Sequence, residues 1–204
     1  MSRRALDSAM SALVLVAVLT ACEGPRPTPA EPTTAAAAPT RVPRIVDESD
    51  RPHVAFDPCL DLPDDVVAAA GYNPTSRRFS DFPATHYTML GCQFDGTLHI
   101  PGVLDRYGLS VLSANFTFEV EQEKTADYAV PTEFAGRRAL LKIDPSRPYS
   151  CGMSVETSYG VLMVGRIHFR DSSAPLPESQ WCVGLDDTVG RIVAVLDDVE
   201  SRPR

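Results

Sequence analysis

The stretch that decides the fold is YSCGMSVETSYGVLMVGRIHF, residues 149–169. Apolar side chains alternate along each half of it, at Tyr149, Cys151, Met153 and Val155 and then at Val161, Met163, Ile167 and Phe169. This alternation predicts two strands, and Thr157–Gly160 between them predicts the turn of a β-hairpin. His168 lies between Ile167 and Phe169, so we expect it on the opposite face from both, directed toward solvent.

After the hairpin, apolar residues recur at spacings of three and four, at Cys182, Leu185, Val189, Ile192, Leu196 and Val199. This spacing places them on one face of an amphipathic helix. Asp186-Asp187 and Asp197-Asp198 fall largely on its outer face. We therefore expect a C-terminal helix, including Cys182, that packs on the sheet.

Further elements are predicted before the hairpin. A short helix capped by Asp61 should end at Gly71. Strands are expected over residues 87–95, 107–121 and 135–143. The apolar positions of the second strand change parity, which predicts an irregularity near Val111-Leu112. The element order indicates an α+β fold: a short N-terminal helix, a four- to five-stranded, mostly antiparallel sheet and the C-terminal helix packed on it.

The N-terminus has the features of a lipoprotein signal. Arg3 and Arg4 precede an apolar run that is too short to span a membrane, and the run ends in Leu19-Thr20-Ala21-Cys22. Residues 1–21 are therefore predicted to be a signal peptide, with Cys22 carrying the lipid that anchors the protein to the membrane. Residues 22–52 are rich in Pro, Thr and Ala, which predicts a disordered tether. Residues 53–204 are then one globular domain on the extracytoplasmic face of the cell membrane.

Four cysteines remain in that domain, Cys59, Cys92, Cys151 and Cys182. Four cysteines in an oxidising compartment indicate two disulfides, for which three pairings exist. We prefer Cys59–Cys92 and Cys151–Cys182, each closing a loop of roughly thirty residues. The second pair would attach the terminal helix to the sheet. A zinc site is disfavoured because the cysteines do not occur in C-x-x-C pairs.

Charge excludes one class of partner. The 52 residues before His53 carry equal numbers of acidic and basic side chains, so the net charge of −8 lies in the domain. Phosphate backbones would be repelled by this excess of acid, and no nucleic-acid partner is expected.

Several motifs occur together in an order that resembles the actinobacterial lipoprotein family called domain of unknown function 3558. They are the Leu19–Cys22 motif and tether, Phe56-Asp57-Pro58-Cys59, Gly91-Cys92-Gln93-Phe94, Ala135-Gly136-Arg137-Arg138-Ala139, the Cys151 strand with its Gly160 hairpin, and Trp181-Cys182. The family usually has an aromatic residue, often Trp, two residues after the second domain cysteine, and Phe94 at this position is a mild departure that changes packing and not chemistry. The resemblance implies an envelope location and two disulfides, and it implies no activity.

Residues that carry chemistry are sparse. The chain has no H-E-x-x-H, G-x-S-x-G, phosphate-binding or dinucleotide-binding motif, and no metal or other cofactor is expected. Arg137 and Arg138 could meet an anionic group, but on a strand they point to opposite faces. His86, Tyr87 and His99 lie in aromatic- and His-containing loops around the Cys92 strand, where recognition residues often lie.

Two functional hypotheses follow. The first is a non-enzymatic binding or interaction module that recognises an envelope protein or a small lipid or glycan. The alternative is an envelope enzyme, a hydrolase with an atypical site, which would require His86 or His99 beside a carboxylate in a pocket.

Overall fold

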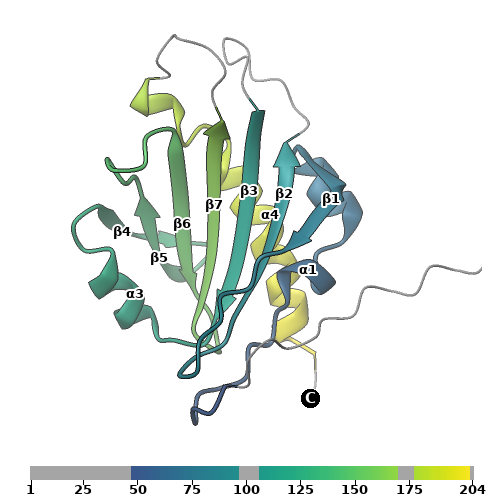
Figure 1. Cartoon of the computed structure of the whole chain (residues 1–204), viewed down its shortest axis with the longest axis vertical. Helices are drawn as coiled ribbons and strands as arrows, with labels where there is room; N and C mark the ends of the chain where they lie inside the picture. The colour runs from purple at the N-terminus through teal and green to yellow at the C-terminus, as the bar shows by residue number, and fades with distance from the viewer. Residues whose placement is uncertain (1–46, 97–105, 170–176, 203–204) are drawn as a thin grey trace, which may run out of the picture. The chain divides into compact units, whose positions relative to one another are not determined.

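Residues 149–169 form the predicted hairpin, which lies within a sheet of seven antiparallel strands (Figure 1). The computed structural model describes residues 47–96, 106–169 and 177–202. The elements are α1 (Pro58–Asp61), α2 (Asp64–Ala69), β1 (Tyr72–Phe79), β2 (Met89–Gly96), β3 (Arg106–Ala114), α3 (Phe118–Lys124), β4 (Ala129–Phe134), β5 (Arg137–Lys142), β6 (Ser150–Glu156), β7 (Val161–Phe169), the 3₁₀ turn η1 (Glu178–Gln180) and α4 (Leu185–Glu200). The α+β class, the C-terminal helix and both disulfides are confirmed, but the sheet has more strands than predicted.

The strand order is β1-β2-β3-β7-β6-β5-β4. Strands β1 to β3 and strands β4 to β7 each form an antiparallel meander, and the two meanders join where β3 pairs with β7. The connection from β3 to β4 carries α3 to the far edge of the sheet. The centre of the sheet therefore depends on one pairing between segments that are distant in sequence.

One face of the sheet packs against α4, which lies behind the sheet in Figure 1. Cross-strand partners form a buried row over this face, made of Cys92, Val111, Val164 and Met153. The helix contributes a buried apolar stripe of Leu185, Val189, Ile192, Val193 and Leu196. Full burial of each aliphatic side chain stabilises the fold by about 1.5–3 kcal/mol, so this layer forms the main core.

The helix starts later than predicted. Gly184, with φ of 75°, is the residue before α4, so Cys182 lies in the turn that leads into the helix. A left-handed backbone conformation suits glycine, which has no Cβ to clash. The Asp pairs 186-187 and 197-198 lie on the exposed side of α4, as expected.

The predicted exposure of His168 is wrong. Its side chain is 3% exposed and faces the main core, whereas Ile167 is 41% exposed on the opposite face. On β7 the residues that face α4 are the even-numbered ones, including Leu162 and Val164. Because both faces of β7 carry apolar residues, alternation alone could not indicate which face the terminal helix covers.

The predicted strand over residues 107–121 is in fact a strand and a helix. β3 ends at Ala114, and α3 begins at Phe118, capped by the Thr117 side chain, which accepts a hydrogen bond from the Val120 amide. Within residues 106–114 the register with both neighbours is continuous, so the irregularity predicted at Val111-Leu112 is absent from this strand. The apolar positions change from odd to even numbers along this segment because the opposite face has its own apolar cluster. This cluster is made of Ala114, Phe116, Phe118, Leu140 and Val161.

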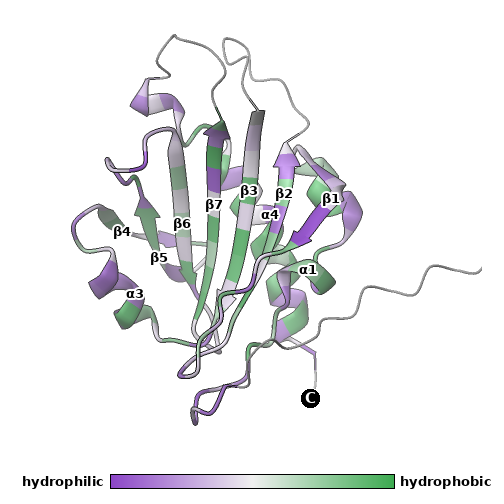
Figure 2. Ribbon diagram, in the orientation of Figure 1, coloured by the Kyte–Doolittle hydropathy of each residue, from purple (hydrophilic) through white to green (hydrophobic). Residues whose placement is uncertain are grey.

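Strands β1 and β4 were not predicted. β1 contains Asn73, Pro74, Arg77 and Arg78, has no apolar alternation, and is largely coloured as hydrophilic in Figure 2. β4 contains Pro131, which argues against an interior strand. Both are edge strands of the sheet, where polar residues and proline are tolerated.

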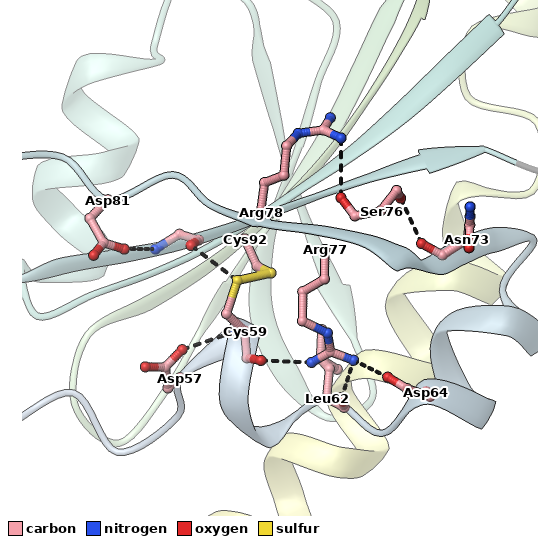
Figure 3. The surroundings of a disulfide bond; sticks show 11 residues. Asp57, Cys59, Leu62, Asp64, Asn73, Ser76, Arg77, Arg78, Asp81 and Cys92 are labelled. Atoms are coloured by element: carbon pink, nitrogen blue, oxygen red, sulfur yellow. Dashed lines mark hydrogen bonds and ion pairs between the residues drawn. A yellow bond between two sulfur atoms is a disulfide. The ribbon is translucent and has the colours of Figure 1, made fainter. Parts of the chain in front are cut away.

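The N-terminal helical segment is two short helices instead of one. Asp57, and not Asp61, caps the first helix: its carboxylate accepts a hydrogen bond from the Cys59 amide at 2.9 Å (Figure 3). Pro63 separates α1 from α2, and Gly71, with φ of 90°, follows the second helix at the predicted end.

The preferred disulfide pairing is confirmed, with Cα–Cα distances of 5.0 Å for Cys59–Cys92 and 5.3 Å for Cys151–Cys182. The first bond joins α1 to β2, and the Arg77 guanidinium donates to the carbonyls of Cys59 and Leu62 beside it (Figure 3). The second bond joins β6 to the turn before α4. Both α1 and the turn that leads into α4 are thus covalently attached to this side of the sheet.

Residues 47–52, assigned by sequence to the tether, contact the domain. The buried Asn115 amide donates to the Asp47 carboxylate at 2.8 Å and to the Pro52 carbonyl at 3.0 Å. Hydrogen bonds from Ser49, Asn115 and Thr88 hold the pKa of Asp47 well below its usual range. The Asn115 amide oxygen also accepts a hydrogen bond from the Thr88 backbone amide at 2.7 Å.

We expect Cys59→Ala/Cys92→Ala and Cys151→Ala/Cys182→Ala each to lower the free energy of unfolding by about 3–4 kcal/mol. A closed loop of this length removes that much chain entropy from the unfolded state. Urea unfolding of the unreduced variants, followed by circular dichroism, measures the loss. An unchanged midpoint in either double variant would contradict a stabilising role for that bond.

Candidate functional site

The face of the sheet opposite α4 is only partly covered. Its lower half packs against α3 and the apolar cluster around Phe116 and Phe118, and Figure 1 views the sheet from this side. Above that cluster a row of cross-strand partners runs over five strands, from β2 to β5: Gln93, Ser110, Gly165, Gly152 and Lys142. These residues are small or polar, so the row separates the apolar half of the face from an open half.

A groove with a volume of about 380 Å³ lies over this row. Its lining comprises Gln93, Ser110, Tyr128, Lys142, Asp144, Arg147, Ser150, Cys151, Gly152, Gly165, Arg166 and Ile167. The side chains of Cys151 and Arg166 are engaged elsewhere, Cys151 with Cys182 and Arg166 with the carbonyls of Trp181 and Val183 near α4. The open face therefore presents the other ten residues as the candidate site.

The floor of the groove is main chain. A Cβ placed on Gly165 would meet no atom within 4 Å, so the space above this residue is open. A Cβ on Gly152 would lie 3.3 Å from the Val164 carbonyl and 3.5 Å from Lys142 Cε. Glycine inside a strand often marks a place where another molecule approaches the backbone closely.

A buried ion pair forms one end of the row. Lys142 Nζ lies 2.7 Å from Glu121 Oε1, and the Ser154 hydroxyl donates to the same oxygen at 2.7 Å. The Glu121 side chain is 6% exposed and comes from α3. This contact ties α3 to β5 and β6 and neutralises the lysine charge at the groove.

The rim near β6 combines a second ion pair with hydroxyl groups. Arg147 and Asp144 are 3.8 Å apart, and hydrogen bonds from Ser146 lower the pKa of Asp144. The Ser150 hydroxyl donates to the Arg147 carbonyl at 2.6 Å. Burial, helped by the charges of Asp144 and Glu121, raises the pKa of Tyr128. A tyrosine phenol is neutral at physiological pH even without this shift, so it can donate a hydrogen bond.

The two arginines predicted as ligand contacts hold structural ion pairs. As expected they point to opposite faces: Arg137 Nη2 lies 2.6 Å from both Asp197 and Glu200 of α4. Arg138 pairs with Glu119 of α3 and with Glu156, so it lies on the other face. Neither arginine is among the groove residues.

The predicted loop residues do not line the groove either. His86 is exposed, and its carbonyl accepts a hydrogen bond from Arg51. Tyr87 packs edge-on against Phe116 with a ring distance of 5.5 Å, and Lys124 lies over its ring. His99 and Cys22 lie outside the described residues.

The groove residues themselves were not predicted as a site. Gln93, Ser110 and Lys142 are ordinary outward residues of strands, and they become a row only through the register of five strands. The one signal in the sequence is the pair of glycines at 152 and 165, within β6 and β7. Glycine weakens the interior of a strand, so its presence there often marks a place where another molecule approaches the backbone closely.

The fold and the groove define a disulfide-bridged α+β domain with one covered and one partly open sheet face. A model of the family described as "Protein of unknown function (DUF3558)" matches residues 17–191, and the chain belongs to this family. No curated protein and no solved structure matches the chain.

None of the described helices is long and apolar enough to cross a membrane. Within residues 47–96, 106–169 and 177–202, no group of three or more His, Cys, Asp or Glu side chains could hold a metal ion.

We expect Lys142→Met to lower the free energy of unfolding by about 3–5 kcal/mol, because it leaves the Glu121 charge buried without its cation. The double variant Lys142→Met/Glu121→Leu should recover most of that loss, since no buried charge is left unpaired. Urea unfolding of Lys142→Met, Glu121→Leu and the double variant gives the coupling free energy. A coupling near zero would show that the pair does not hold α3 on the sheet.

Proposed function

We propose that this protein is a lipoprotein anchored through Cys22 on the extracytoplasmic face of the cell membrane. The Arg3–Cys22 pattern supports a lipid signal, and the Pro/Thr/Ala-rich stretch supports a tether. The two disulfides agree with an oxidising compartment outside the cytoplasm. The domain then works at a distance from the membrane set by the tether.

We further propose that the domain is a non-enzymatic binding module of the cell envelope. The observation that carries this proposal is the groove on the open face of the sheet, with its main-chain floor and polar rim. Ligand sites are concave and largely preformed, and a sheet fixed by disulfides provides such a surface. The ligand is an envelope component, either a protein segment or a small lipid or glycan.

The alternative, an envelope hydrolase, depends on a histidine placed beside a carboxylate in a pocket. Among the described residues that line the groove there is no histidine. His86 lies on an exposed loop away from it. The contacts around the groove favour binding because its charged groups are already engaged with one another.

The anchor is tested by Cys22→Ala in the full-length protein. We expect the native protein to partition with membranes and into detergent, because its acyl chains bury many methylene groups. Mass spectrometry should find acylated Cys22 at the N-terminus of the native protein and no acyl mass on the Cys22→Ala protein. A native protein without acyl mass at Cys22 would refute lipidation at this cysteine.

The binding face is tested by placing a photo-crosslinking residue at Gln93, on the groove, in cells that express the full-length protein. We expect a discrete adduct from this position. The matched control is the same residue at Arg191, which is half-exposed on α4 on the opposite side of the sheet. Adducts from both positions alike, or from neither, would argue against the groove as the binding surface.

A further inference from the structure

The groove offers hydrogen-bonding groups of both kinds with little net charge. Gln93 can donate and accept through its amide, and Ser110 can do both through its hydroxyl. Neither side chain makes a hydrogen bond to another residue in the described part of the chain, so both are available to a ligand. Tyr128 and Ser150 add two more hydroxyl groups at the rim.

The charged groups of the groove compensate one another. Lys142 is neutralised by the buried Glu121 at 2.7 Å, and Arg147 has Asp144 as its neighbour at 3.8 Å. An anionic headgroup would have to compete with these carboxylates for its cations, and a cationic ligand would have to compete for the carboxylates. The electrostatics of the groove therefore favour a neutral polar ligand.

The shape of the groove limits the ligand further. Ser110, Gly165 and Gly152 are on three adjacent strands, so the low part of the floor is about 10 Å wide at the usual strand spacing. A volume near 380 Å³ is at the small end of the range for ligand sites. Ile167 is the one aliphatic side chain among the groove residues, which is too little to bury an acyl chain.

These observations together describe a ligand with many neutral donors and acceptors and a flat apolar face. Sugar rings have this character: hydroxyl groups around the edge, and C–H groups on the faces. The C–H face can lie on the glycine floor and against Ile167 and the Tyr128 ring, while the hydroxyl groups reach Gln93, Ser110 and Asp144. We propose that the groove binds a neutral saccharide, a mono- or disaccharide unit of an envelope glycan; this proposal rests on the binding function proposed above.

The test uses residues 22–204 with Cys22→Ala, the chain without its predicted signal peptide and lipid, so that no detergent is needed. Saturation-transfer NMR and calorimetry are recorded with a panel of neutral disaccharides built from glucose, galactose, mannose and N-acetylglucosamine. Glycerol 3-phosphate and phosphatidylglycerol vesicles serve as probes for an anionic headgroup. We expect binding to at least one disaccharide and to neither anionic probe.

The decisive variant is Gly165→Val. Its added side chain enters open space, so the fold should be retained, and a β-branched residue suits a strand. The same side chain fills the floor of the groove and should weaken saccharide binding more than tenfold. Gln93→Ala should weaken binding without blocking the floor. Gly190→Ala is the matched control, because Gly190 lies on α4 and is not a groove residue. Its added Cβ would meet only the Phe134 ring, at 3.7 Å.

The outcomes separate the two proposals. Saccharide binding that is lost in Gly165→Val and kept in Gly190→Ala, with unchanged thermal unfolding, supports the inference. Binding that Gly165→Val leaves intact would overturn the groove as the saccharide site. Binding to the anionic probes alone, or crosslinks from Gln93 in cells without binding to any disaccharide, would overturn the saccharide while leaving a binding module. No binding and no crosslink would overturn both.

Discussion

The structure depends on how a sheet with two apolar faces is covered by few helices. The central strands β3 and β7 have buried residues on both sides, with Val111 and Val164 on one face and Ala114 and Val161 on the other. α4 covers the first face along 16 residues, whereas α3 has 7 residues and covers only part of the second. The uncovered part must therefore be polar or lack side chains, which is the composition of the row from Gln93 to Lys142.

Covalent and ionic contacts fix these covers in place. The two disulfides attach α1 and the start of α4 to the same face of the sheet, and Arg137 pairs with the C-terminal end of α4 through Asp197 and Glu200. On the other face the Lys142–Glu121 pair and the Arg138–Glu119 pair hold α3. The adjacent residues Arg137 and Arg138 thus bind helices on opposite faces of the sheet, Arg137 to α4 and Arg138 to α3, which explains the two charges at the start of β5. Ion pairs at these positions leave the groove without a strong field of either sign.

Much of this architecture could be predicted from local pattern. The hairpin at Thr157–Gly160, the apolar stripe of α4 and the pairing of the four cysteines depend on short-range spacing, and the structure has them. The side of His168 could not be predicted, because alternation on β7 fits either face until the position of α4 is known. The edge strands could not be predicted either, since β1 and β4 are held by their neighbours and lack an apolar pattern of their own. The groove is the clearest case: its floor comes from five strands, its rim includes loop residues, and these residues share no sequence signal except two interior glycines.

The attachment of Asp47 and Pro52 to Asn115 has a mechanical consequence. A pull applied to the N-terminal end of the domain is carried first by hydrogen bonds at the end of β3, one of the two central strands. Once these bonds break, the chain can be peeled away only as far as Cys59, where the bond to Cys92 transfers the load directly to β2. The loop closed by these cysteines, which are 33 residues apart, therefore cannot extend under this load. It contains most of α1, all of α2 and β1, and the first half of β2. Tension on the N-terminal side thus reaches β2 through the disulfide and bypasses the edge strand β1.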